Sequence, residues 1–232
     1  MVSCGVHSET RALGQVQNCL EKYVQELFPD CESTWTRFEG DLDVEETDDN
    51  KEDTTAVDDK RKEKKFQAVD AACGGLVFYR FRINVKPTEF IDKMMDAMSQ
   101  LSKPELEELL PRIRHTARWI PLDYICPATT ERMAKCFERL REDHFKEVSD
   151  DDKRTVAIVT EIRNNISLKK EDIIQTIAPL IPKGLKVDLK KPTDVIFVTV
   201  FKSVCGMTVL KDYYEKKKYN IVGLLQEKAS AA

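Results

Sequence analysis

The order of apolar and polar positions along the chain predicts alternating strands and helices. Residues 1–6 form a short apolar run typical of a strand. Ser8 is placed to cap a helix whose apolar side chains recur every three or four positions as far as residue 27. Residues 76–85 predict a further strand, because from Tyr79 onward aromatic and aliphatic side chains occupy every second position. This alternation indicates one buried face and one solvated face.

Further signals complete the N-terminal part of the chain. Pro87 ends the alternating strand, and residues 90–101 repeat apolar side chains, many of them methionine, at helical spacing, which is far more typical of a core helix than of a binding groove. A weak alternation at 33–39 indicates another strand. Residues 112–129 mix basic and apolar side chains with two prolines and predict a linking strand, and residues 130–145 predict a helix.

The C-terminal third predicts a strand, a helix and a second strand in succession. Residues 155–163 read as a strand, residues 170–181 carry isoleucine and leucine at helical spacing, and residues 195–201 are almost wholly apolar. A strand covered on both faces has this composition, and a unit of this length favours parallel pairing with a right-handed crossover. The apolar residues 205–210 follow, and residues 211–220 predict a helix that bears tyrosines. The fold class is therefore α/β, in the broader α+β sense.

Length and composition are consistent with one large domain or two small ones. The chain has 232 residues, of which 41% are apolar and 34% are charged, so it can build a core although its charged share exceeds the ~25% typical of globular proteins. No apolar run approaches the ~20 residues that cross a bilayer, and the first residues lack the pattern of a secretory signal. We therefore expect an intracellular protein without a membrane partner.

Charge is unevenly distributed along the chain. The net charge is −4, but residues 41–65 carry eleven Asp and Glu against six Lys and Arg, with almost nothing to bury. This stretch predicts a disordered acidic insert. Residues 153–218 reverse the balance, with fourteen Lys and Arg against seven Asp and Glu. A solvated lysine-rich surface explains any single cluster, but the recurrence of clusters within one segment favours a polyanionic partner.

The residue types that catalysis or metal binding would need form no recognisable pattern. Phosphate-binding glycine loops, nucleophile elbows, and metalloprotease or kinase motifs are absent from the sequence. The seven cysteines are widely spaced and the three histidines are far apart, so neither a disulfide framework nor a metal site is predicted. Cys73 and Cys205 each precede a glycine and leave a cysteine-dependent enzyme as an alternative, although buried structural thiols are commoner. We expect no cofactor and no catalytic residue.

Candidate nucleic-acid contacts concentrate in the basic C-terminal segment. Arg163 and Asn164 close a strand just before a helix that begins near Lys169, so their side chains would converge on a helix N-terminus, which attracts phosphate. Lysines and tyrosines are interleaved in residues 211–220, a combination that suits phosphate contacts and base stacking, unless the tyrosines pack inward. The predicted contacts, which include a smaller N-terminal group, are Arg80, Arg82, Arg114, Arg118, Arg163, Asn164, Lys169, Lys170, Lys202, Lys211, Lys216, Lys217 and Lys218.

Short sequences in the same segment resemble the THUMP domain, specifically that of the Tan1-like family. They are Arg163-Asn164-Asn165, Lys186-Val187-Asp188-Leu189 followed by Pro192, Lys211-Asp212-Tyr213 and Lys218-Tyr219-Asn220. Each is weak alone, but together and in order they are a fairly strong signal. The N-terminal sequence SCGVHSETRALGQVQNCLEKY is similar to the start of the ferredoxin-like domain that precedes THUMP in that family. The resemblance implies a ferredoxin-like domain at 1–100, which contains the insert, and a THUMP domain with a mixed, partly parallel sheet at 105–225.

The resemblance also implies a function. Tan1-like proteins bind tRNA and act with an RNA cytidine acetyltransferase, which supplies the chemistry of N4-acetylcytidine formation. Other THUMP proteins carry a catalytic domain on the same chain, whereas these 232 residues leave no room for one, so we expect a non-catalytic tRNA-binding adaptor. Two alternatives stay open: a protein interaction scaffold without RNA binding, and an RNA-binding subunit of a different tRNA-modifying complex. The compartment, nuclear, nucleolar or cytoplasmic, and the oligomeric state are left open as well.

Overall fold

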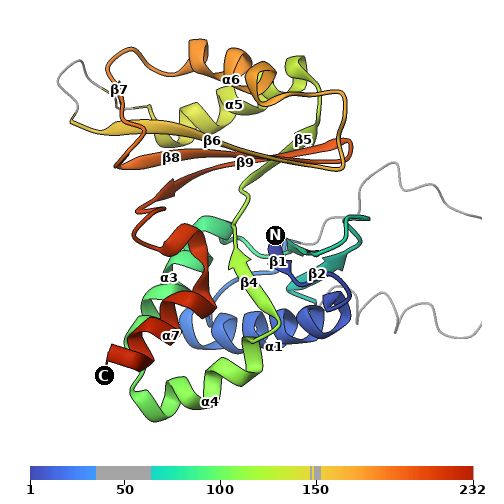
Figure 1. The fold of residues 1–232 in the computed structure, drawn as a ribbon, viewed down its shortest axis with the longest axis vertical. Coiled ribbons are helices and arrows are strands. Elements are labelled where there is room, and N and C mark those ends of the chain that lie inside the picture. The colour runs from blue at the N-terminus through green and yellow to red at the C-terminus, as the bar shows by residue number, and fades with distance from the viewer. Residues whose placement is uncertain (35–63, 147, 149–152, 232) are drawn as a thin grey trace, which may run out of the picture.

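The computed structural model describes residues 1–34, 64–146, 148 and 153–231. Within them the chain builds a four-stranded and a five-stranded sheet, and the larger sheet lies above the smaller one in Figure 1. The disordered insert predicted at 41–65 lies outside the described residues except at its last two positions. Most of the strand predicted at 33–39 lies outside them too, although Ser33 forms an antiparallel bridge with Ile83.

The four-stranded sheet and the helices packed with it form what we term the first unit. In chain order its elements are β1 Val2–Cys4, α1 Glu9–Leu27, β2 Phe66–Val69, β3 Leu76–Phe81, α3 Pro87–Ser99, α4 Lys103–Ile113 and β4 Thr116–Trp119. The strands lie in the order β2-β3-β1-β4, and each neighbouring pair is antiparallel. Apart from the additional helix, this is the split βαβ arrangement that a ferredoxin-like domain requires.

Helix α4 is an element that the hydrophobic pattern did not predict. It begins with a capping box, in which the backbone N–H of Ser102 donates to Glu105 at 2.7 Å. Pro104 lies in the first turn, where its missing N–H leaves no bond unmade. Apolar side chains at helical spacing form the buried face of the helix. Pro111 and the charged residues around this short stripe obscured it in the sequence.

The five-stranded sheet and its helices form the second unit. Its elements are β5 Tyr124–Pro127, α5 Thr130–His144, β6 Thr155–Arg163, α6 Lys170–Ile177 with the 3-10 turn Ala178–Leu180, β7 Lys186–Val187, β8 Asp194–Phe201 and β9 Val204–Lys211. The strand order is β5-β9-β8-β6-β7, with β6 parallel to β7 and β8 and the remaining pairs antiparallel. The predicted mixed, partly parallel sheet is therefore confirmed. Where one linking strand was expected, β4 and β5 lie in different sheets, because the chain passes there between the units.

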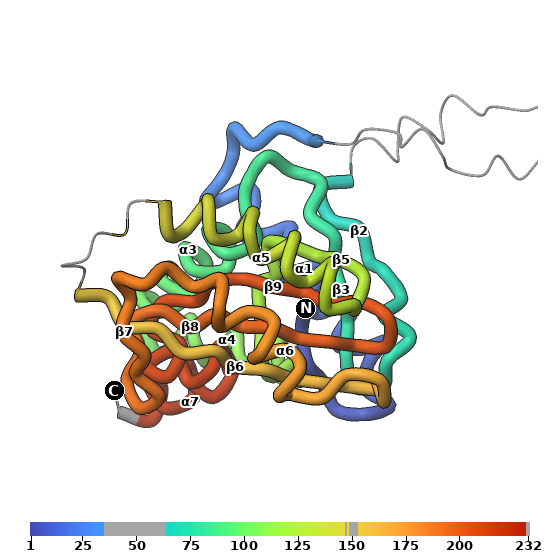
Figure 2. Tube along the Cα trace, turned by 90° about the horizontal axis from the view of Figure 1, so that it is seen from above, coloured from blue at the N-terminus to red at the C-terminus, as the bar shows by residue number. Residues whose placement is uncertain are grey.

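Strand β8 is buried along its whole length, as its apolar sequence predicts. Successive side chains point to opposite faces of the sheet. Ile196 and Val198 belong to a core that includes α5 and α6, whereas Val195 and Phe197 belong to the core of the first unit. Figure 1 shows this layering, and Figure 2 shows the same stack from above. One face of the larger sheet therefore packs directly on the first unit.

After β9 the chain returns to the first unit. Residues 211–220 form tight turns, and helix α7, Ile221–Ala231, then lies against α3, α4 and β4 (Figure 1). The Nζ of Lys228 donates to the carbonyl oxygen of Leu101 at 3.0 Å, and Ile221 and Leu225 are buried. Helix α7 is thus part of the core of the first unit. The division into domains at 1–100 and 105–225 stays a prediction.

The helix predicted for residues 211–220 is wrong. The segment contains only the 3-10 turn Lys217–Tyr219, and φ lies between 49° and 61° at Asp212, Lys217, Lys218 and Tyr219. This is the left-handed region, which costs a non-glycine residue on the order of 1 kcal/mol. A regular right-handed helix would not reverse the chain toward α7, so surrounding contacts have to hold the turn.

Candidate nucleic-acid interface

Three of the predicted contacts meet where β6 and β8 end. These parallel strands finish side by side, with Arg163 opposite Phe201 in the register. The N–H of Lys202 donates to the carbonyl of Arg163 at 3.0 Å, and Nδ2 of Asn165 donates to the carbonyl of Lys202 at 2.6 Å. Arg163, Asn164 and Lys202 are therefore held within one short stretch of the sheet edge.

The loop that follows β6 leads directly into α6, and two more predicted contacts, Lys169 and Lys170, stand at the start of that helix. Oδ1 of Asn165 accepts from two backbone N–H groups of the loop, at 2.9 and 3.0 Å, which fixes its course. Lys169 is the N-cap of α6, and its N–H donates to Asp172 at 2.8 Å. Part of the helix N-terminus that sequence reasoning assigned to phosphate is thus satisfied by the chain's own carboxylate. We term the set Arg163, Asn164, Lys169, Lys170 and Lys202 the rim.

Loops of the first unit reach the rim. The Nδ2 of Asn164 donates to the Sγ of Cys73 at 3.3 Å. A Cβ at Gly75 would stand 4.0 Å from the guanidinium of Arg163 and 3.2 Å from the carbonyl oxygen of Cys4, and Gly75 has φ +74°. Both the close approach and the left-handed backbone require glycine at this position. The rim is therefore bordered by both units.

The loops around the rim, like the turn at residues 211–220, contain left-handed backbone. The non-glycine residues with positive φ in these loops are His7, Ala72, Asn164 and Lys202. This conformation is unfavourable for residues with a side chain, and such strain gathers where loops present particular groups to a ligand. The carboxylate of Glu9 helps to hold the loops, because it accepts the N–H of Gly75 at 2.7 Å, and this hydrogen bond lowers the pKa of Glu9.

The remaining C-terminal lysines lie at the opposite end of the sheet. Strand β9 carries the chain to Lys211 over eight residues, roughly 24 Å at ~3.4 Å per residue. Lys216 and Lys217 form ion pairs with carboxylates of α3 and α7, with nitrogen-to-oxygen distances of 2.7 and 2.5 Å. Lys211 and Lys218 are exposed and have no ion pair among the described residues. The structure thus separates the C-terminal basic residues into two groups rather than one.

The four predicted arginines of the N-terminal half do not form one patch. Arg118 on β4 makes a two-pronged ion pair with Glu161 on β6, one bond of which measures 3.0 Å, and these hydrogen bonds raise the pKa of Arg118. Arg82 is buried and donates to a glutamine on β2 at 2.8 Å. Arg80 is exposed on β3, and Arg114 is exposed at the end of α4. Arg82 and Arg118 are therefore engaged by other side chains of the fold, and Nε of Arg114 donates to Nε2 of the neighbouring His115 at 3.2 Å.

Sequence reasoning missed the first-unit loops that border the rim and the acids that hold the other basic residues. The Gly74-Gly75 pair before a strand was a signal for a tight, close-packed turn. No local pattern links Lys216 to its partner on α3, because 124 residues separate them. Long-range pairs of this kind become visible only in the folded structure.

Other kinds of functional site find little support. Cys205 is fully buried in β9 and Cys73 is 7% exposed, so neither thiol is open to a substrate. Across the described ranges, no group of three or more metal-binding side chains is placed to hold an ion. Within the same part of the chain, no helix has both the length and the apolarity needed to span a membrane.

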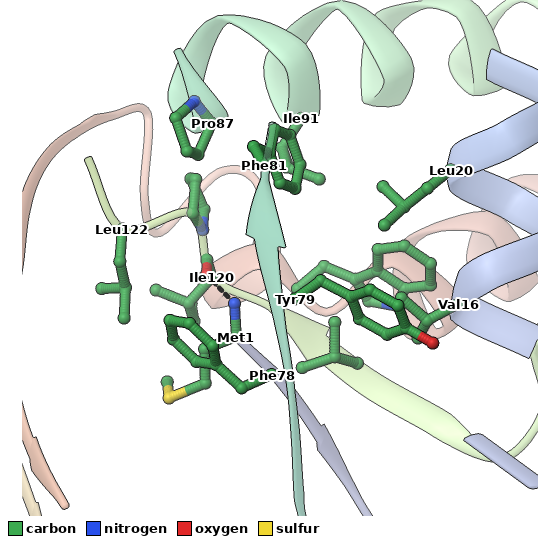
Figure 3. A pocket seen from close by; sticks show the side chains of 13 residues that line it. Met1, Val16, Leu20, Phe78, Tyr79, Phe81, Pro87, Ile91, Ile120 and Leu122 are labelled. Atoms are coloured by element: carbon green, nitrogen blue, oxygen red, sulfur yellow. Dashed lines mark hydrogen bonds between the residues drawn. The ribbon is translucent and has the colours of Figure 1, made fainter. Parts of the chain in front are cut away.

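A small cavity lies in the core of the first unit (Figure 3). Its volume is about 30 Å³, and apolar side chains such as Val16, Phe78 and Ile91 line it. The amino nitrogen of Met1 donates to the carbonyl of Ile120 at 3.0 Å on one side. This space holds about one or two water molecules, too little for a cofactor.

The second unit matches a known family. Residues 127–210 match the model described as the THUMP domain, a stretch that runs from the last residue of β5 almost to the end of β9. The chain therefore contains a THUMP domain, and the rim lies within it.

Known proteins resemble the chain over most of its length. It is homologous to THUMP domain-containing protein 1 of Mus musculus, with 27% identity over 231 residues, which cover 95% of this chain and 62% of that protein. It is also 27% identical to tRNA acetyltransferase TAN1 of Saccharomyces cerevisiae, over 97% of this chain and 84% of that one. The crystal structure of PH1313 from Pyrococcus horikoshii Ot3 shares the fold at a TM-score of 0.50 and 10% identity, over 90% of this chain and 53% of that chain. The chain thus spans less than two thirds of the length of the mouse relative.

Proposed function

We propose that this protein binds tRNA across the rim and acts as a non-catalytic adaptor that presents tRNA to an RNA cytidine acetyltransferase for N4-acetylcytidine formation. The THUMP domain supports the RNA-binding part of the proposal. Similarity to a protein named tRNA acetyltransferase TAN1 supports the link with acetylation. Acetyl transfer itself is assigned to the partner enzyme.

The observation that carries the proposal is the rim. Arg163, Lys169, Lys170 and Lys202 have no ion-pair partner among the residues that the structure describes, and hydrogen-bonded loops fix the backbone that bears them. Proteins read folded RNA largely through its shape and its phosphates. Positive side chains at fixed spacing suit that task, and the adjoining loops of the first unit let both units face the same RNA.

A pair of charge-matched variants tests the rim. Reversing Arg163→Glu together with Lys202→Glu is expected to weaken tRNA binding by about tenfold or more at ~0.1 M salt, because at least two phosphate contacts become repulsive. Lys22→Glu with Lys135→Glu changes the net charge equally, but these lysines lie in exposed i,i+4 pairs on α1 and α5. That control should bind as wild type does. Fluorescence anisotropy with labelled tRNA measures both, and equal losses would contradict a localised rim.

The scaffold alternative gives a different outcome in the same assay. Under that hypothesis the wild-type protein binds no tRNA at any salt concentration, and neither double variant binds tRNA. Under the proposal, binding by the wild type falls steeply as salt rises, because each neutralised phosphate releases counterions.

The chemical part of the proposal is tested in cells. Nucleoside analysis of tRNA from cells that lack the protein should show loss of N4-acetylcytidine, and the rim double variant should fail to restore it while the Lys22/Lys135 control succeeds. Loss of a different modified nucleoside would point to another tRNA-modifying complex. An unchanged nucleoside profile would contradict the adaptor role.

A further inference from the structure

The turn at residues 211–220 is held by contacts from both units. Its backbone is left-handed at three successive positions, Lys217, Lys218 and Tyr219, none of which is glycine. Such a run persists only where the surroundings determine it. Besides local hydrogen bonds and the ion pair of Lys217 with α7, the turn is held by contacts from far along the chain, which join the first unit to the second unit or to its exit.

Asp92 on α3 makes the first set of these contacts. Its Oδ1 accepts from Nζ of Lys216 at 2.7 Å and from the hydroxyl of Tyr219 at 2.8 Å. The ammonium of Lys216 also lies 5.3 Å from the centre of the Tyr219 ring, and that ring is fully buried. One carboxylate of the first unit therefore fixes both ends of the strained turn.

Glu161 on β6 makes the second contact, in which the second unit supplies the acid and the first unit supplies the basic residue. Its carboxylate belongs to the second unit and binds the guanidinium of Arg118 on β4 of the first unit. The side chains of Arg118 and Glu161 are only 24% and 20% exposed, respectively. The backbone of Arg118 also forms an antiparallel bridge with Asn220, at the exit of the turn. Each unit thus supplies an acid that holds a basic residue of the other unit or of the segment leading back from it.

We propose that Asp92 and Glu161 are positioning residues for tRNA binding, which fix the first unit against the THUMP domain so that both meet one RNA. We term Asp92, Arg118 and Glu161, together with the turn residues Lys216, Tyr219 and Asn220 that Asp92 and Arg118 contact, the clamp. This inference rests on the proposed function. It also reassigns Arg118 and Lys216 from RNA contacts to internal ion pairs, because their charged groups already bind carboxylates.

Neutralising either acid distinguishes a positioning role from a simple electrostatic effect, because the two predict opposite changes in tRNA affinity. Asp92→Asn and Glu161→Gln each make the protein less negative, so a purely electrostatic account predicts tighter tRNA binding. The clamp predicts weaker binding, by roughly two- to thirtyfold, the range in which residues that couple distant sites act. Asp212→Asn is the matched control: it removes an exposed acid of the same turn that has no ion pair among the described residues, and asparagine tolerates its left-handed φ of 55°. Binding by this control should be unchanged or slightly tighter.

A charge swap tests whether Lys216 contacts RNA directly. Asp92→Lys combined with Lys216→Asp restores an ion pair with the same net charge. Near-wild-type affinity of the swap, after the loss in Asp92→Asn, supports the clamp. A swap as weak as Lys216→Asp alone overturns it, because the charge at position 216 would then be what RNA reads. Tyr219→Phe, with Tyr214→Phe as control, repeats the test without any change of charge if Asp92→Asn lowers the folded fraction.

Movement between the units is measured without RNA. Fluorescent labels at exposed positions 22 on α1 and 135 on α5 report the distribution of distances between the units by energy transfer. The clamp predicts a broader distribution in Asp92→Asn and Glu161→Gln and a wild-type distribution in Asp212→Asn. Unchanged distributions overturn the inference, as does broadening without weaker tRNA binding. If the wild-type protein binds no tRNA, the proposed function fails, and the distance measurement alone decides whether the clamp holds the units together.

Discussion

The rim and the turn at residues 211–220 are similar in sequence and different in structure. Both are rich in basic residues, and they lie at opposite ends of the same sheet. At the rim the basic side chains have no ion pair within the described part of the chain, whereas Lys216 and Lys217 bind carboxylates of α3 and α7. Local positive charge alone therefore does not show which basic side chains are available to a polyanion. The deciding question is whether an acid from elsewhere in the fold already neutralises it.

The largest effect on stability should come from removing the buried aromatic ring of Tyr219 in the turn. Tyr219→Ala removes a fully buried aromatic side chain and its hydrogen bond to Asp92, so the free energy of unfolding should fall by about 3–5 kcal/mol. Tyr214→Ala, at a position 41% exposed, should change it by less than about 1 kcal/mol. Urea denaturation followed by circular dichroism measures both. Small and equal losses would show that the turn is not held as described.

Salt dependence should separate the two regions next. The rim variant Arg163→Glu with Lys202→Glu should flatten the slope of log affinity against log salt by about 1.4–1.8, since each phosphate contact contributes roughly 0.7–0.9. Lys218→Gln, which removes an exposed lysine of the turn without an ion pair among the described residues, should flatten it by at most ~0.9. Anisotropy titrations at several salt concentrations give both slopes. A larger change for Lys218→Gln would move the footprint to the turn.

Alanine substitutions at two glycines, Gly75 and Gly14, test the geometry of the loops beside the rim. Gly75→Ala should destabilise the protein by about 1–2 kcal/mol, because alanine is strained at φ +74° and its Cβ would meet the carbonyl of Cys4 at 3.2 Å. Gly14→Ala adds the same methyl group in the middle of α1, where nothing lies within 4 Å. That control should stabilise the protein by about 0.5–1 kcal/mol. Thermal unfolding measures both variants. Equal changes in their unfolding temperatures would contradict the described loop geometry.

The smallest effect should be a pH dependence confined to the first-unit loops beside the rim. The N–H of Gly75 lowers the pKa of Glu9 below its usual 4.5, so the fold favours the ionised carboxylate. Its contribution is therefore complete above about pH 4.5 and is lost as the pH falls through the lowered value. The protection factor of the Gly75 amide, which is its intrinsic hydrogen-exchange rate at each pH divided by the observed rate, should fall in that range. In Glu9→Gln the protection factor should not change across the same range. Glu107→Gln, on the exposed side of α4, should behave like the wild type.

The sequence was most informative where one residue pattern had one structural cause. Residues 195–201 are apolar at nearly every position because α5 and α6 cover one face of β8 and the first unit covers the other. The parallel pairing with β6 followed from the length of the crossover. Helix α4 was missed because its stripe is short and contains Pro111, although the capping box from Ser102 to Glu105 was readable.

The candidate site was only partly predictable for a related reason. Arg163 and Lys202 could be placed near each other, because the ends of parallel strands meet at one sheet edge. The roles of Arg118 and Lys216 depend on acids 43 and 124 residues away, and no periodicity links such positions. Residues 211–220 had helical composition, but the need to return the chain to the first unit imposed a left-handed turn.

The return of α7 to the first unit has a consequence for the order of folding during synthesis. All four strands of the first unit emerge from the ribosome before the THUMP domain, yet Ile221 and Leu225, which complete its core, are made after the whole second unit. The five-stranded sheet has every strand it needs by residue 211. The nascent first unit therefore keeps part of its apolar core exposed while the second unit is translated. Helix α7 covers that part only after both units have been synthesised.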